Sequence, residues 1–182
     1  MESSGVNASI TYDSTENAYA LTSLSSGMKC FPITPLNGLD NFKLTCDVRT
    51  PSTNNNYAIG LAPIIASTHT GMSMVIDKES AGFRTVVHRD KNNSEQFWGE
   101  AQNISNYNTA NYYKMELVVQ GDTATWNLYD GNLTLLNTYS YNLSDLSTDY
   151  NTLANRDYGI SLGWINSSAT KMYVKNIKAE PL

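Results

Sequence analysis

Hydrophobic and polar residues alternate along this chain with a period of two. The clearest case is segment 112–141, in which Gly121-Asp122 and Asp130-Gly131-Asn132 separate three runs rich in β-branched and aromatic residues. Tight turns between antiparallel strands select Gly, Asn and Asp. In the middle run, one face carries Ala124, Trp126 and Leu128, and the other carries Thr123, Thr125, Asn127 and Tyr129. The pattern predicts a three-stranded antiparallel meander with one buried face.

The same alternation predicts strands in the rest of the chain. Residues 42–49 alternate Phe, Leu, Cys and Val with polar residues, which is typical of a half-buried strand. Gly60 lies inside another predicted strand and indicates a bulge or a close backbone approach. No run of ten or more residues has the 3.6-residue period of a helix. The predicted strands outside the meander are 6–12, two within 18–33, 42–49, 57–62, 72–77, 82–89, 96–100, 158–165 and 171–179.

These strands predict an all-β fold. Short strands at even spacing within 182 residues are typical of a two-sheet antiparallel β-sandwich or jelly roll. The length fits one domain, and a domain of this size buries about 70% of its unfolded surface. We expect residues 1–5 to form a flexible N-terminal linker and residues 6–182 to form a single β-sandwich domain.

Composition and charge exclude several classes of partner. Only 16% of the residues are charged and the net charge is -5, which disfavours nucleic acid because its binding needs Lys and Arg to neutralise phosphates. No apolar run approaches the length of about 18 residues expected of a membrane span. The N-terminal segment lacks the basic and apolar parts of a signal peptide. This leaves two alternatives open: a fragment cut from a larger protein, or export by another route such as inside a virion.

The two cysteines, Cys30 and Cys46, both fall in apolar strand patterns. A disulfide between them and two free buried thiols are both compatible with these patterns. No Cys-x-x-Cys motif or Cys/His cluster is present, so we expect no zinc site.

Three segments resemble the concanavalin A-like lectin/glucanase superfamily. They are NFKLTCDVR followed by YAIGLA, the meander YYKMELVVQGDTATWNLYDG, and the closing YGISLGW and KMYVKNIKA. The resemblance covers most of residues 18–179 and rests on strand order and turn residues. It implies a LamG-like jelly roll with a convex and a concave sheet, and glycan binding on the concave face or in rim loops. Such modules occur in secreted enzymes, surface adhesins and phage structural proteins, so the fold alone does not fix the function.

The sequence offers no catalytic motif of these relatives. Glucanases of the superfamily carry Glu-x-Asp-x-x-Glu on one strand, and retaining glycosidases need two carboxylates about 5 Å apart. That run is missing here, and the nearest acidic pairs are Asp77 with Glu79 and Glu95 with Glu100. The first pair is expected at a solvated strand end beside Lys78. The Arg, Gln and His strand motifs of alginate lyases are also missing, and no spacing indicates a nucleophile with its base. We therefore expect a protein without catalytic residues.

The chain does carry the side chains that bind sugars. Aromatic rings stack on the apolar faces of sugars, while amides, carboxylates and Arg bond their hydroxyl groups. We expect Trp126 and Trp164 in the core, because each alternates with aliphatic residues. Several other aromatic and charged residues lie in or beside the Asn-rich loop that follows residue 100, or on the neighbouring strand. The predicted glycan ligands are Trp98, Arg84, His88, Asp90, Tyr107 and Tyr112.

The sequence thus predicts a non-catalytic carbohydrate-binding or adhesion module of a phage virion, in its tail or receptor-binding part, or of a cell-surface protein. Its expected partners are a glycan on a cell surface and either virion proteins or a second copy, with no nucleic acid and no membrane. Two alternatives stay open: a polysaccharide-degrading, glycosidase-like enzyme of the same fold, and a purely architectural virion domain. We expect no cofactor; calcium remains an option, although no Asp-x-Asp-x-Asp loop assigns its ligands.

Overall fold

The structure is a computed structural model that describes residues 8–23, 29–32, 41–50, 58–65, 70–79, 82–91, 94–145, 157–163 and 171–182. Residues 1–5, predicted as a linker, lie outside these ranges, as does Trp164. The described strands are β1 (Ala8–Asp13), β2 (Ala18–Ser23), β3 (Lys29–Pro32), β4 (Asn41–Arg49), β5 (Ala58–Ile65), β6 (Thr70–Glu79), β7 (Gly82–Lys91), β8 (Ser94–Asn103), β9 (Tyr113–Gln120), β10 (Thr123–Tyr129), β11 (Leu135–Asn142), β12 (Asp157–Gly163) and β13 (Met172–Pro181), with the short helix η2 (Leu143–Asp145).

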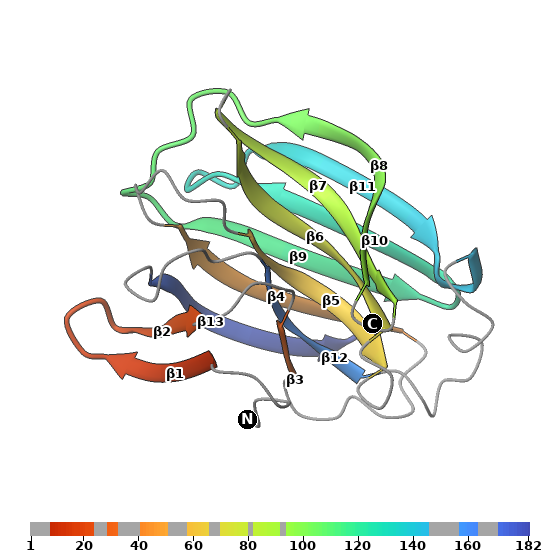
Figure 1. The fold of residues 1–182 in the computed structure, drawn as a ribbon, viewed down its shortest axis with the longest axis horizontal. Helices are drawn as coiled ribbons and strands as arrows, with labels where there is room; N and C mark the ends of the chain where they lie inside the picture. Colours follow the sequence, from red (N-terminus) through yellow and green to blue (C-terminus); the bar gives the residue numbers. More distant parts are fainter. Residues whose placement is uncertain are drawn as a thin grey trace.

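The strands form two antiparallel sheets that stack face to face (Figure 1). The seven-stranded sheet has the order β1-β2-β13-β4-β9-β10-β11, and the six-stranded sheet has the order β3-β12-β5-β6-β7-β8. The predicted meander is β9-β10-β11, and its strands pair as antiparallel neighbours. The all-β two-sheet sandwich predicted from the sequence is therefore confirmed.

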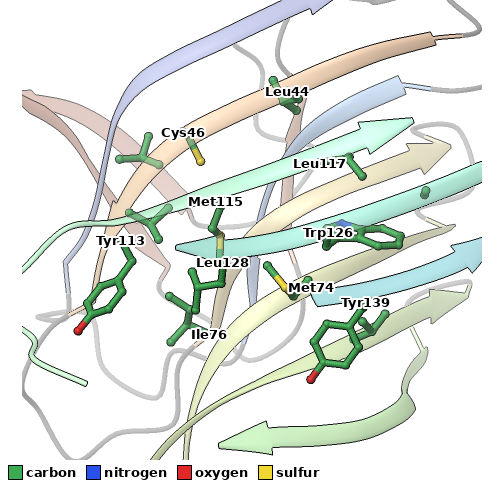
Figure 2. Close-up of a cluster of buried hydrophobic side chains, with 14 of the residues drawn as sticks. Leu44, Cys46, Met74, Ile76, Tyr113, Met115, Leu117, Trp126, Leu128 and Tyr139 are labelled. Carbon is green, nitrogen blue, oxygen red and sulfur yellow. The ribbon is translucent and has the colours of Figure 1, made fainter. Parts of the chain in front are cut away.

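The core lies between the sheets and is built from alternate residues of each strand. In β9 and β10 every second side chain is buried, because successive side chains point to opposite faces of a sheet. Figure 2 shows Trp126 and Leu128 of β10 facing Met74 and Ile76 of β6. Trp126 is fully buried, so its predicted core position is confirmed. Burial of a large apolar side chain contributes about 1.5–3 kcal/mol, which makes this layer the main source of stability.

Cys46 of β4 belongs to this core and is a free thiol. Burial raises its pKa, and the nearby charge of Asp47 raises it further. The thiol therefore stays protonated and packs as a small apolar group. The side chain of Cys30 lies outside the part of the chain that the structure describes.

On one side of the sandwich, edge strands β8 and β11 are joined by side chains. The Tyr139 hydroxyl donates to the carbonyl oxygen of Thr85 at 2.8 Å and accepts the amide N–H of Gln102 at 3.2 Å. The Asn137 amide donates to the hydroxyl of Thr85 at 2.6 Å and to the carbonyl oxygen of Gln102 at 3.2 Å. The β7–β8 register shifts beside Thr85, and these bonds occupy backbone groups at that irregularity.

None of the helical segments in the described ranges has the length and apolar character needed to span a bilayer.

Candidate functional site

The outer face of the six-stranded sheet carries a charged pair on β6 and β7. Met74 and Ile76 of β6 face the core, so the residues between them face outward. The register places Val75 opposite Val86 and Asp77 opposite Arg84. Residues directly opposite in an antiparallel pair share one face, so these side chains form one row.

Arg84 and Asp77 form a well-defined ion pair. The Nε and Nη2 atoms of Arg84 donate to Oδ2 of Asp77 at 3.1 and 2.8 Å. The Asp77 side chain is only 11% exposed, whereas that of Arg84 is 25% exposed. Charge-assisted bonds of this kind fix the orientation of the guanidinium group. The buried carboxylate thus holds an arginine whose outer part reaches solvent.

The rest of the row is covered. Val75 and Val86 are buried and form a small cluster separate from the main core. Ser73, which lies farther along the same face, is also buried. Of the described side chains in this row, that of Arg84 is therefore the one that reaches solvent most, beside its partner Asp77. The candidate site is the end of the row nearest the β6–β7 turn.

Asp77 corrects a prediction from the sequence. Its neighbour Lys78 and its place near the strand end indicated a solvated carboxylate, but Asp77 is buried. The reason is the regular β6–β7 register, which continues to the pair Glu79 and Gly82 and brings Arg84 opposite Asp77. Pairing the two predicted strands residue by residue outward from Glu79 and Gly82 would have predicted that Arg84 lies opposite Asp77.

Three of the predicted ligands are described by their backbone only. His88 and Asp90 lie on β7, where positions 84, 86, 88 and 90 alternate with the core-facing ones. Trp98 lies on β8 as the register partner of Val87. The side chains of His88, Asp90 and Trp98 lie outside the described part of the structure, so their roles stay predictions.

Tyr107 is part of an aromatic stack at the end of the sandwich. Its ring lies between those of Phe83 and Tyr113, with centroid distances of 4.1 and 4.3 Å and near-parallel planes. Its hydroxyl group lies 2.8 Å from that of Thr50. Both faces of the Tyr107 ring are covered, which corrects the expectation that it stacks on a sugar. The polar loop around it gave no sign of these partners.

Tyr112 lies on the outer face of the other sheet. The guanidinium carbon of Arg49 is 5.1 Å from the Tyr112 centroid and 4.6 Å from that of Tyr173. The ammonium nitrogen of Lys175 is 3.7 Å from the Tyr112 centroid. Burial raises the pKa of the Tyr112 phenol, while the Arg49 charge lowers it.

The six-residue ligand set expected from the sequence is therefore not one cluster. Arg84 lies on the outer face of the six-stranded sheet and Tyr112 on that of the seven-stranded sheet, with the core between them. The sequence placed Tyr112 beside the loop that follows residue 100 and Arg84 on the neighbouring strand, but β7 belongs to one sheet and β9, which Tyr112 directly precedes, belongs to the other.

No metal centre appears among the described residues: in those ranges, no group of three or more His, Cys, Asp or Glu side chains is placed to hold an ion.

Comparison with known proteins reveals the fold. No protein-family model and no curated protein matches the sequence. Solved structures do match over nearly the whole chain. The carbohydrate-binding module CBM66 from Bacillus subtilis has a TM-score of 0.65 at 13% identity, covering 98% of this chain and 94% of that one. The chain has a concanavalin A-like jelly-roll fold.

Two further structures share this concanavalin A-like fold. The CBM2 module of the evolved Dit protein of Lactobacillus casei BL23 phage J-1 has a TM-score of 0.62 at 12% identity, covering 95% of this chain and 79% of that one. A family 7 alginate lyase in complex with substrate has a TM-score of 0.59 at 11% identity, covering 95% and 82%. Identities this low show a shared jelly roll, which hosts binding modules and enzymes alike.

Proposed function

We propose that this concanavalin A-like domain is a non-catalytic carbohydrate-binding module that contacts its saccharide at the Asp77–Arg84 pair. The observation that carries the proposal is a partly exposed guanidinium group fixed on the outer sheet face by a buried carboxylate. Fixed polar groups bind hydroxyl-rich ligands well, because little side-chain freedom is lost on binding. Two carbohydrate-binding modules among the similar structures support this class of function.

The neighbouring positions extend the proposed site. His88 and Asp90 follow Arg84 at alternate positions of β7 and extend the site along the same row. Imidazole and carboxylate groups supply hydrogen bonds for the hydroxyl groups of a sugar. The proposed ligand set is therefore Arg84, His88 and Asp90. Trp98 is not part of this set, because position 98 pairs with the core-facing Val87. We propose that the site works without a cofactor, and chelation of calcium in the binding assay tests this.

The proposed setting is extracellular, on a virion or a cell surface. The similar module in a phage Dit protein supports a virion as one such setting. The partner would be a surface glycan, and within a virion the domain would also contact other virion proteins or further copies of itself.

A catalytic role is the second candidate, favoured by the similar alginate lyase. A lyase or glycosidase would shorten its polysaccharide, whereas a binding module leaves it intact. Size analysis of the polysaccharide after incubation with the protein separates the two functions, and shortened products would overturn our proposal.

The test of the site is a polysaccharide-binding screen with the variant Arg84→Lys. Lysine keeps the positive charge opposite Asp77 but lacks the planar fork of hydrogen-bond donors. Loss of one charge-assisted bond costs about 1.5–3 kcal/mol, so we expect binding to weaken about tenfold or more. Isothermal titration calorimetry measures the affinity, and the melting temperature reports the fold.

The matched control is Lys43→Gln, on the outer face of the seven-stranded sheet. Lys43 lies 3.3 Å from Glu180, and both side chains are partly exposed. This variant should bind as the wild type does. Equal affinity of wild type and Arg84→Lys would place the site elsewhere, and a wild type that binds no glycan would favour the architectural alternative.

A further inference from the structure

Two tyrosines on the β1–β2 hairpin form an exposed aromatic pair. Tyr12 and Tyr19 are direct cross-strand partners, with ring centroids 5.8 Å apart and planes inclined at 69°. Tyr12 is 60% exposed and Tyr19 is 42% exposed, although Ala18 and Ala20 on either side of Tyr19 are buried. Large aromatic groups side by side in solvent are typical of a contact surface.

The pair is held in place by the turn that joins the two strands. The Tyr12 hydroxyl donates to Oδ1 of Asn17 at 2.6 Å, and Asn17 adopts a left-handed backbone with φ of 48°. The carboxylate of Asp13 accepts the amide N–H groups of Thr15 and Glu16 at 3.1 and 3.3 Å. The orientation of the Tyr12 ring is thus fixed before any ligand arrives, which lowers the entropy that binding costs.

The hairpin is also tied to the body of the sandwich. Glu16 lies 2.8 Å from Arg49 of β4, and the guanidinium of Arg49 lies over the ring of Tyr173 of β13. This contact links the turn to two central strands. The aromatic pair is therefore presented on a fixed element rather than on a free loop.

The chemistry of this surface indicates an uncharged ligand. Aromatic faces stack on the apolar C–H face of a pyranose ring, and the Asn17 amide and the Tyr19 phenol can bond its hydroxyl groups. The charged groups of the turn are the carboxylates of Asp13 and Glu16, and the second of these is already paired with Arg49. The remaining negative charge disfavours an acidic sugar. We infer that Tyr12, Tyr19 and Asn17 form a second binding site, for a neutral saccharide.

The topology separates this site from the first one. Strand β1 is one edge of the seven-stranded sheet and β11 is the other. The side chains of β11 contact β8, which is the neighbour of β7 in the six-stranded sheet. The strand orders therefore place the hairpin and the Asp77–Arg84 pair toward opposite edges of the sandwich. Figure 1 shows β1 and β2 apart from β6 and β7. A short oligosaccharide occupies one site at a time, whereas two sites together strengthen binding to long polysaccharides through avidity.

This inference rests on the proposed function, and its test separates the two. Titration calorimetry compares the wild type with Arg84→Lys and with the double variant Tyr12→Ala/Tyr19→Ala. Xylo-oligosaccharides and galactomannan oligosaccharides are the neutral probes, and alginate oligosaccharides are the acidic probe. We expect the wild type to bind two neutral oligosaccharides per chain and the double variant to bind one. The double variant should bind the corresponding long neutral polysaccharides about tenfold more weakly than the wild type does, or more weakly still.

The control is Leu133→Ala with Leu135→Ala, which removes two other exposed apolar side chains. Because all four residues are exposed, both double variants should remain folded, with melting temperatures above the assay temperature, and the control should bind as the wild type does. If the tyrosine variant binds as the wild type while Arg84→Lys loses binding, the second site is overturned and the proposed function stands. If the tyrosine double variant loses binding only to the alginate oligosaccharides, the assignment of a neutral saccharide to this site is overturned. If the wild type binds none of the probes, both proposals are overturned.

Discussion

At the scale of single residues, Trp126 contributes the largest fully buried side chain among those that the structure describes. Its ring lies between the sheets, with the ring of Tyr141 at a centroid distance of 6.5 Å. We expect Trp126→Ala to lower the free energy of unfolding by about 3–5 kcal/mol, because it removes buried area and leaves a cavity. Urea denaturation followed by circular dichroism measures the change.

Trp98→Ala is the companion variant. The sequence predicts a glycan ligand at position 98, whereas its register partner Val87 faces the core. A binding role predicts weaker saccharide binding with an unchanged fold, and a core role predicts a loss of stability like that of Trp126→Ala. If Trp98→Ala unfolded the protein and Trp126→Ala did not, the assignment of these two rings to binding site and core would be reversed.

These residues also show which side-chain positions strand alternation can predict and which it cannot. Trp126 and Cys46 were placed correctly, because the period of two directly encodes which side chains point inward. The partners of Tyr107 were not predictable in this way. Phe83 lies 24 positions before Tyr107, and the two rings meet only because the loop after β8 folds back across the end of the sandwich. Alternation within one strand holds no information about such contacts.

At the scale of elements, Gly60 shows why one strand needs a residue without a side chain. The β5–β6 register runs through Gly60 and Val75 without a shift, so the strand has no bulge there. A Cβ atom at position 60 would lie 1.9 Å from the carbonyl oxygen of Met74. Of the two readings drawn from the sequence, the close backbone approach is confirmed and the bulge is wrong.

We therefore expect Gly60→Ala to lower the free energy of unfolding by about 1–3 kcal/mol or more, because strands β5 and β6 must separate locally. Gly131→Ala is the matched control, since the nearest atom to its added methyl group is the Tyr112 carbonyl oxygen at 4.0 Å. Thermal unfolding of both variants measures the difference. Equal melting temperatures would show that the strands adjust without cost.

The irregular register between β7 and β8 could not be predicted from the sequence. Both strands were predicted, but β8 spans Ser94–Asn103 and is longer than the predicted 96–100. The register shift beside Thr85 depends on Tyr139 and Asn137, which lie more than fifty positions away and supply its hydrogen bonds. The shift moves the partners of positions 102 and 103 by two residues, whereas position 98 pairs with Val87 in the regular register that starts at Lys91 and Ser94. A shift of two residues keeps each position on the same face, so the register places position 98 on the core-facing side with Val87.

At the scale of the whole molecule, sheet order decides what can act together. Twelve or so short strands predict a sandwich, but many strand orders satisfy the same pattern of buried and exposed positions. The observed order places the β1–β2 hairpin far from β7, and it places Tyr112 and Arg84 on opposite faces. For this reason the sequence supplied the right kinds of side chain for glycan binding while grouping them wrongly.

The same order leaves β8 and β11 as sheet edges on one side of the molecule, and the Tyr139 hydroxyl joins them. Tyr139→Phe removes only that oxygen, leaving the part-buried amide of Gln102 and the buried carbonyl of Thr85 without this partner. Unsatisfied buried polar groups cost about 1–3 kcal/mol, so we expect a loss of that size in the free energy of unfolding. Tyr129→Phe is the control, because the Tyr129 hydroxyl bonds the partly exposed Glu116 and its loss should cost less.

Two further measurements connect this loss to the closure of the sandwich. Hydrogen exchange should become faster at the Gln102 amide in Tyr139→Phe and stay unchanged in Tyr129→Phe. Unchanged protection in both variants would mean that other contacts hold the two edge strands together.

Burial also raises the pKa of Tyr139, so the folded state retains the phenol proton more strongly than the unfolded chain does. Its contribution is complete below the unfolded pKa of about 10 and is lost as the pH rises through the folded pKa. The wild type should therefore lose more stability than Tyr139→Phe in strongly alkaline solution, and the two unfolding curves should converge there.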